Sequence, residues 1–152
     1  MELGLAQIIE RLLLAASLGA LIGLEREWNQ KAAGLRTNTL IAVGSALFTL
    51  MSIELAPPDR AADPTRIASQ IVTGIGFLGG GAILRTGGSV KGLTTAATIW
   101  VNAAIGVAAG AGSFRLAAVA ALTTLIVLRL LLPVERVVER HHDRREMPPG
   151  TE

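Results

Sequence analysis

The side chains of this sequence with the greatest potential for chemistry are charged groups at the ends of apolar segments. Glu25 and Arg26 close the first segment, and three cations lie where later segments begin or end: Arg36, Arg85 and Lys91. If the two halves of the chain form a repeat, two helix N-termini face the cytoplasm together, and each carries unpaired N–H groups and a positive dipole end. These three cations then form a cationic vestibule beside them. Such a vestibule suits a phosphate, a lipid head group or an acidic partner segment better than a bare metal cation. The alternative is that these charges are topology signals and interfacial ion pairs.

Uncharged polar side chains lie inside the apolar segments or near their beginnings. Gln70 and Asn102 are amides within segments. There an interhelical hydrogen bond is worth about 1 kcal/mol, and a pore or substrate contact is the alternative. Asn38 begins another segment, and Thr94 and Thr95 lie near the beginning of the segment that contains Asn102. We include all five among the candidate binding residues.

Several classes of chemistry are disfavoured by the residue types present. The sequence has no cysteine and no tyrosine, and its two histidines, His141 and His142, lie in a charged tail. The apolar segments therefore lack thiol nucleophiles, disulfides, zinc clusters and histidine acid-base pairs, and we predict neither an enzyme nor a cofactor. Glu54, Asp59 and Asp63 share one connection with two arginines. We interpret them as a solvated turn rather than a magnesium site, so no metal ligands are predicted.

The composition indicates a chain that folds in the bilayer. Of its 152 residues, 51% are hydrophobic and only 17% are charged, and the mean hydropathy is +0.51. Soluble domains carry about 25% charged residues. The cations punctuate apolar runs and do not form a basic stripe with interleaved aromatics, so we expect no nucleic-acid partner.

The apolar runs predict an all-α, polytopic membrane bundle of about five transmembrane helices. A hydrocarbon core of about 30 Å requires about 20 mostly apolar residues per helix. The expected spans are Leu5–Leu24, Asn38–Ile53, Ile67–Leu84, Leu93–Gly110 and Phe114–Leu132, and all six prolines fall outside them. They form a transmembrane domain, residues 1–132, followed by a short charged cytoplasmic tail, residues 133–152. A bundle of four helices with one interfacial segment is the alternative.

Orientation follows from the distribution of lysine and arginine, which are retained on the cytoplasmic side. Ten cations lie on the side of the first and third connections and the C-terminus: Arg26, Lys31, Arg36, Arg85, Lys91, Arg129, Arg136, Arg140, Arg144 and Arg145. Four lie on the other side: Arg11, Arg60, Arg66 and Arg115. We therefore expect the N-terminus outside and the C-terminus in the cytoplasm.

Small residues recur every fourth position and predict close helix packing, which is a main source of association energy in lipid. The predicted packing glycines are Gly19, Gly23, Gly76, Gly80, Gly106 and Gly110.

A possible internal repeat relates the first two spans to the next two. Gly34–Thr37 matches Gly92–Thr95, and at the same offset Gly23 matches Gly81. The predicted topology then contains two parallel-repeat hairpins plus one helix. Chance matching of windows rich in Gly and Ala is the alternative.

Four ordered motifs resemble the MgtC/SapB family of bacterial membrane proteins. They are Gly23–Glu27, Ala33–Asn38, Gln70–Gly79 and Lys91–Ala97, and the resemblance extends from about Leu12 to Gly112. It implies an inner-membrane protein of about five spans, linked to growth at low magnesium and, in pathogens, to survival inside macrophages. Family members are often labelled magnesium transporters, although some resemble regulators of membrane partners such as the F-type ATP synthase. Many carry a soluble C-terminal domain, whose roles cannot be carried over to the short tail here.

Taken together, these features predict a non-enzymatic regulator, and the resemblance implies a role in adaptation to low magnesium and, where the host is a pathogen, in virulence. Its expected partners are the lipid bilayer and either another membrane protein or a second copy bound through small-residue faces. The alternative is a magnesium transporter or channel, for which carboxylates would be expected well inside the spans. The acids near the spans all lie toward the ends: Glu10, Glu25, Glu27 and Glu54.

Overall fold

The computed structural model describes residues 3–55, 65–86 and 89–146, with the backbone alone at 65–67, 86 and 132–146. Helices dominate the described residues, and the predicted all-α bundle of five helices is confirmed. The elements, in order, are α1 (Leu5–Trp28), α2 (Leu35–Glu54), α3 (Thr65–Gly81), β1 (Leu84–Thr86), β2 (Ser89–Lys91), α4 (Leu93–Gly110) and α5 (Phe114–Glu146).

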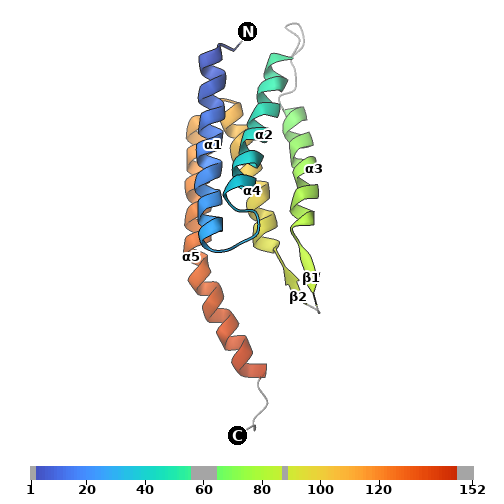
Figure 1. The fold of residues 1–152 in the computed structure, drawn as a ribbon, viewed down its shortest axis with the longest axis vertical. Helices are drawn as coiled ribbons and strands as arrows, with labels where there is room; N and C mark the ends of the chain where they lie inside the picture. The colour runs from blue at the N-terminus through green and yellow to red at the C-terminus, as the bar shows by residue number, and fades with distance from the viewer. Residues whose placement is uncertain (1–2, 56–64, 87–88, 147–152) are drawn as a thin grey trace.

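The five helices run alternately up and down, so the two ends of the chain lie at opposite ends of the bundle (Figure 1). Four are long and apolar enough to cross a membrane: α1, α2, α4 and the Phe114–Leu131 part of α5. α3 has 17 residues, at the lower end of the range for a membrane span. The chain is therefore a multi-pass membrane protein.

α4 is the central helix, because it contacts each of the other four. α1 and α2 pack closely against each other and against α4, whereas α3 lies at one edge and contacts α4 more extensively than α2. Figure 1 shows α3 on the opposite side of the bundle from α5.

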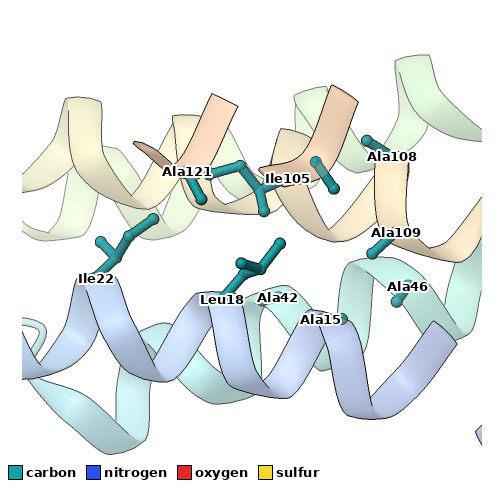
Figure 2. Close-up of a cluster of buried hydrophobic side chains, with 10 residues drawn as sticks. Ala15, Leu18, Ile22, Ala42, Ala46, Ile105, Ala108, Ala109 and Ala121 are labelled. Atoms are coloured by element: carbon teal, nitrogen blue, oxygen red, sulfur yellow. The ribbon is translucent and has the colours of Figure 1, made fainter. Parts of the chain in front are cut away.

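Most of the side chains in the main core are small. Figure 2 shows Leu18 and Ile22 of α1 facing Ile105 of α4 in a setting made mostly of alanines. The cluster consists of Ala15, Leu18, Ile22, Ala42, Ala46, Ile105, Ala108, Ala109, Ala117 and Ala121. Small residues let the helix backbones approach closely, which is how helices associate in lipid.

Four of the six predicted packing glycines lie at such close approaches. A Cβ on Gly19 would lie 2.7 Å from the Ala42 Cβ, and one on Gly23 would lie 2.7 Å from the Leu35 Cα. Gly106 and Gly110 of α4 approach the α2 backbone at Ala42 and Ala46 in the same way. Only glycine fits these four positions without a shift of the neighbouring helix.

The prediction that Gly76 and Gly80 pack against a neighbouring helix is wrong within this chain. Nothing lies within 4 Å of a Cβ built on either residue, and both are exposed. Successive residues on a helix point about 100° apart. Because Ile75 and Gly79 point toward α4, the positions that follow them turn away.

A two-stranded antiparallel hairpin follows α3 and was not predicted. The third span was expected to reach Leu84, but α3 ends at Gly81, and Leu84 then pairs with Lys91 across the hairpin. Three consecutive glycines, Gly79–Gly81, have low helix propensity and end the helix here. Gly92, between β2 and α4, has a φ of +91°, a left-handed conformation that favours glycine.

α5 continues to Glu146, so the predicted boundary between Leu132 and Pro133 falls inside a helix. Pro133 therefore lies outside the predicted span, as expected, but inside a helix rather than in a connection. A proline there removes one helical hydrogen bond without ending the helix. The remaining prolines fall outside the described residues.

The two hairpins of the possible repeat share direction but not packing. α2 and α4 both begin after a glycine N-cap, Gly34 and Gly92, at the same end of the bundle (Figure 1). However, Gly23 lies against Leu35, whereas its counterpart Gly81 has open space around it. The two halves of the possible repeat therefore do not share the same helix contacts.

Gly106→Ala and Gly76→Ala are expected to change stability in opposite directions. A Cβ on Gly106 would lie 2.9 Å from the Ala42 Cα, and such overpacking costs about 1–3 kcal/mol. Gly76 has open space, and alanine is favoured over glycine in a helix by about 1 kcal/mol. Thermal unfolding of the purified chain in detergent, followed by circular dichroism, measures both. Equal shifts for the two variants would contradict this account of the packing.

Candidate functional site

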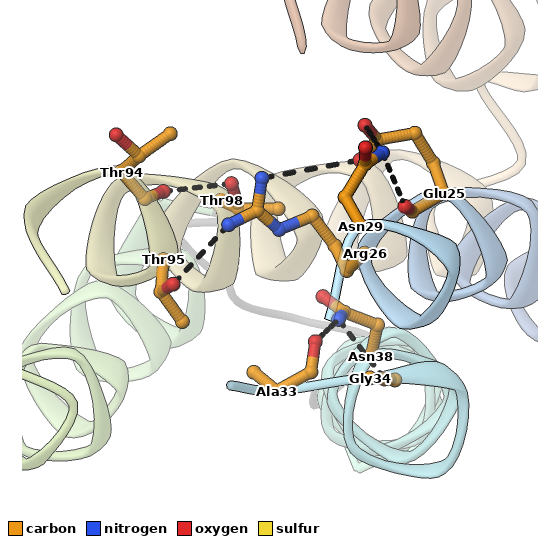
Figure 3. Close-up of polar contacts among 9 residues, drawn as sticks. All are labelled: Glu25, Arg26, Asn29, Ala33, Gly34, Asn38, Thr94, Thr95 and Thr98. Atoms are coloured by element: carbon orange, nitrogen blue, oxygen red, sulfur yellow. Dashed lines mark hydrogen bonds and ion pairs between the residues drawn. The ribbon is translucent and has the colours of Figure 1, made fainter. Parts of the chain in front are cut away.

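Six polar or charged side chains form a buried cluster where the ends of α1, α2 and α4 meet. Each is at most 5% exposed, and we call them the buried polar cluster: Glu25, Arg26, Asn38, Thr95, Thr98 and Asn102. Figure 3 shows Arg26 reaching from α1 toward Thr95 on α4, with Asn38 on α2 below it. Buried polar groups are costly unless they are paired, so the contacts within this cluster determine its stability.

Arg26 and Glu25 form the charged half of the cluster. The Arg26 Nη2 donates a hydrogen bond to the Thr95 Oγ1 at 3.2 Å, and its Nη1 lies 3.9 Å from the Glu25 Oε2. The Glu25 Oε1 accepts a hydrogen bond of 2.7 Å from the Asn29 Nδ2. The guanidinium and the carboxylate are each 3% exposed. Two opposite charges are thus removed from solvent together, and the Glu25 Oε2 that faces Arg26 accepts no hydrogen bond from the described residues.

Asn102 and Asn38 form the uncharged half and join α4 to α2. The Asn102 Nδ2 donates to the backbone carbonyl of Asn38 at 2.7 Å and to its Oδ1 at 3.1 Å. The Asn38 Nδ2 in turn donates to the carbonyls of Ala33 and Gly34. The Asn102 Oδ1 is buried without a hydrogen bond.

The turn between α1 and α2 is held by Asn38 of this cluster and by Glu27, which lies outside it. Gln30 and Ala33 have φ values of 51° and 56°, in the left-handed region that non-glycine residues rarely adopt. The amide of Asn38 binds the Ala33 carbonyl, and the Glu27 Oε2 accepts a hydrogen bond of 2.8 Å from the Leu35 N–H. A carboxylate at this helix N-terminus is favourable because of the helix dipole.

The sequence profile of the MgtC family matches residues 12–137 of this chain. The chain belongs to the MgtC family. The resemblance inferred from the four motifs is therefore confirmed.

Named relatives in other bacteria agree with this assignment. The chain is 54% identical over 120 residues to Protein MgtC of Salmonella typhimurium LT2, covering 79% of this chain and 49% of that protein. It is 52% identical over 128 residues to Protein MgtC of Brucella abortus strain 2308, covering 84% and 52%. An uncharacterized protein of Synechocystis is 48% identical over 128 residues, covering 84% and 53%. The chain thus spans about half the length of these relatives. No solved structure matches it.

In this MgtC-family chain, the ten predicted binding residues divide into two groups. Glu25, Arg26, Asn38, Thr95 and Asn102 come together in the buried polar cluster. Arg36, Gln70, Arg85, Lys91 and Thr94 are exposed and lie outside it. Within the cluster, the Glu25 carboxylate forms an ion pair with its neighbour Arg26.

Three residues of the site were not among those predicted. Thr98 is buried between Thr95 and Asn102, at a spacing of three and four residues, which places all three on one face of α4. This row of polar residues was visible in the sequence and could have identified Thr98. Asn29 binds Glu25, which lies four residues before it, a spacing that the sequence also shows. The contact of Glu27 with the Leu35 N–H depends on the path of the turn, for which the sequence carries no comparable pattern.

Arg26→Met is expected to destabilise the protein by about 3–5 kcal/mol, because it leaves the Glu25 carboxylate buried without its charge partner. The double variant Glu25→Gln/Arg26→Met is expected to recover part of this loss, since no buried charge remains. Lys91→Met removes an exposed cation and serves as the matched control, with an expected change within about 0.5 kcal/mol. Unfolding in detergent measures all three. A double variant no more stable than Arg26→Met would show that the ion pair is not the important contact.

Proposed function

We propose that this chain is a bacterial inner-membrane protein that supports growth at low magnesium, and virulence where the host is a pathogen. It acts there as a non-enzymatic regulator of membrane partners. Membership of the MgtC family supports this proposal, as do the apolar helices. We further propose that the N-terminus lies outside and the C-terminus in the cytoplasm, because ten of the 14 cations lie on the C-terminal side. The buried polar cluster then lies near the cytoplasmic face.

The observation that favours regulation over transport is the tight packing of α1, α2 and α4. Gly19 and Gly106 both approach Ala42 so closely that no side chain fits between the helices. Glu25 and Glu27, the acids nearest this interface, accept hydrogen bonds from Asn29 and from the Leu35 N–H. A hydrated magnesium ion would therefore have to break both the packing and these contacts.

The outward face of α3 is the surface that we assign to a membrane partner. Gly76 and Gly80 recur at a spacing of four, lie exposed, and have no neighbour within 4 Å of a built Cβ. Helices associate in lipid through rows of this kind. Phe77, which lies between them in sequence, is 84% exposed. Either a helix of another membrane protein or a second copy of this chain would cover this face.

The proposal of a regulator predicts that the protein supports growth at low magnesium without transporting magnesium. The chain is expected to restore growth at low magnesium to a bacterium that lacks its own MgtC-family protein. The purified, folded protein in proteoliposomes is expected to pass no more magnesium than empty liposomes do, because the bundle is closed. Magnesium flux that is present in the parent chain and lost in Glu25→Ala would overturn the proposal in favour of a magnesium transporter.

The assignment of the partner surface predicts that Gly80→Trp reduces growth at low magnesium to the level without the protein, because the added ring blocks helix contact. Val119→Trp is the matched control, since Val119 is 62% exposed on α5 and receives the same bulk. Growth curves and membrane levels of both variants are the measurements. Equal growth of the two variants at equal protein level would place the partner surface elsewhere.

A further inference from the structure

A groove runs between α2 and α3 and opens outward from the bundle. Its volume is about 850 Å³, within the range of about 300–1,000 Å³ that is typical of sites for whole small molecules. The groove exists because α3 packs mainly on α4, through Ile75 and Gly79, and leaves much of its side facing α2 uncovered.

The walls of the groove are apolar over most of its length. They include Leu40, Gly44 and Phe48 of α2 and Ile71, Gly74 and Leu78 of α3. Nothing lies within 4 Å of a Cβ built on either glycine. Neither glycine is therefore required for helix packing in this chain, and both deepen the groove.

Ser45 and Gln70 are polar residues within the lining, and the one charged residue of the lining lies at the end of the groove formed by the first turn of α2. Arg36 and Thr37 line it in the first turn of α2, beside the turn that connects α1 and α2. Because α2 is long and apolar enough to span a membrane, we expect this end of the helix at the membrane interface. Arg36 is exposed, and its guanidinium presents planar donors that match phosphate oxygens. The nearest acid in the turn, Glu27, already accepts a hydrogen bond from the Leu35 N–H.

We propose that the α2–α3 groove binds an anionic diacyl phospholipid, with its acyl chains between α2 and α3 and its phosphate at Arg36 and Thr37. At hydrocarbon depth no water is available to fill an apolar space, so the groove requires an apolar occupant. A single cation at the interfacial end of an apolar groove matches the charge distribution of such a lipid. A partner helix finds a different surface, the row of Gly76 and Gly80, on another face of α3.

Lipid retention by the purified full chain tests the proposal. The protein is delipidated in detergent and offered phosphatidylglycerol or phosphatidylcholine, and the lipid bound per chain is counted by native mass spectrometry. We expect several-fold more phosphatidylglycerol than phosphatidylcholine. Arg36→Gln should reduce phosphatidylglycerol to the level of phosphatidylcholine and leave the latter unchanged. Arg115→Gln, an arginine at the start of α5 that does not line the groove, should retain the preference.

Matched glycine variants test the place of binding. Gly74→Leu fills the groove and should lose both lipids, whereas Gly76→Leu makes the same change one helix face away and should retain them. Gly44→Leu fills the groove from the opposite wall and replaces Gly74→Leu if that variant does not fold. Equal binding of the two lipids by the parent chain would overturn the proposal, as would equal losses in the groove-filling variant and Gly76→Leu. A lipid-free dimer abolished by the groove-filling variant would show that a second copy occupies the groove, and would overturn it too.

This inference goes beyond the proposed regulatory function and can fail separately from it. Lipid retention is measured on purified protein without any partner. The growth test with Gly80→Trp concerns a different face of α3, so a negative result in one experiment leaves the other intact.

Discussion

Close contact between the backbones of α1, α2 and α4 is the constraint on which the rest of the structure depends. In lipid, an apolar side chain gains little by moving from acyl chains to protein, so helices associate through short-range packing. Gly19 and Gly106 meet the same residue of α2, Ala42, from two helices. This proximity brings Arg26 within reach of Thr95, and Asn102 within reach of Asn38. The buried polar cluster is thus a consequence of the glycine contacts.

The cluster in turn couples helix packing to the shape of the α1–α2 turn. Asn38 accepts a hydrogen bond from Asn102 on α4 and donates to the carbonyls of Ala33 and Gly34 in the turn. The left-handed conformation of a non-glycine residue such as Ala33 costs free energy, and it persists only where the surrounding structure enforces it. One buried amide therefore connects α4 to a strained turn at the end of α1. Any displacement of α4 at Asn102 would withdraw a donor from the residue that holds this turn.

Sequence reasoning identified the five helices because apolar runs of nearly membrane length have few other solutions. It identified rows of glycines but not what each row faces. Gly76 and Gly80 have the same spacing as Gly106 and Gly110, yet a phase difference of one residue along α3 turns them outward.

The polar contacts and the short strands show the same limit. Strands of three residues are too short to show an alternation of polar and apolar residues. The partner of Glu25 depends on helix phase and on the path of the turn. Polar residues spaced three and four apart on one helix face can be recognised in the sequence, as the row formed by Thr95, Thr98 and Asn102 illustrates. The sequence does not reveal which neighbouring side chains become hydrogen-bond or ion-pair partners once the helices pack together.

α3 differs from the other helices in the balance of its contacts, and this difference bears on function. α1, α2 and α4 cover one another, whereas α3 is held chiefly at Ile75 and Gly79 against α4. Its side toward α2 forms one wall of the groove, and another side carries Gly76 and Gly80. A ligand or helix that binds either side meets an existing surface and does not have to separate packed helices. We therefore propose that recognition takes place on α3, while α1, α2 and α4 form the frame that holds it.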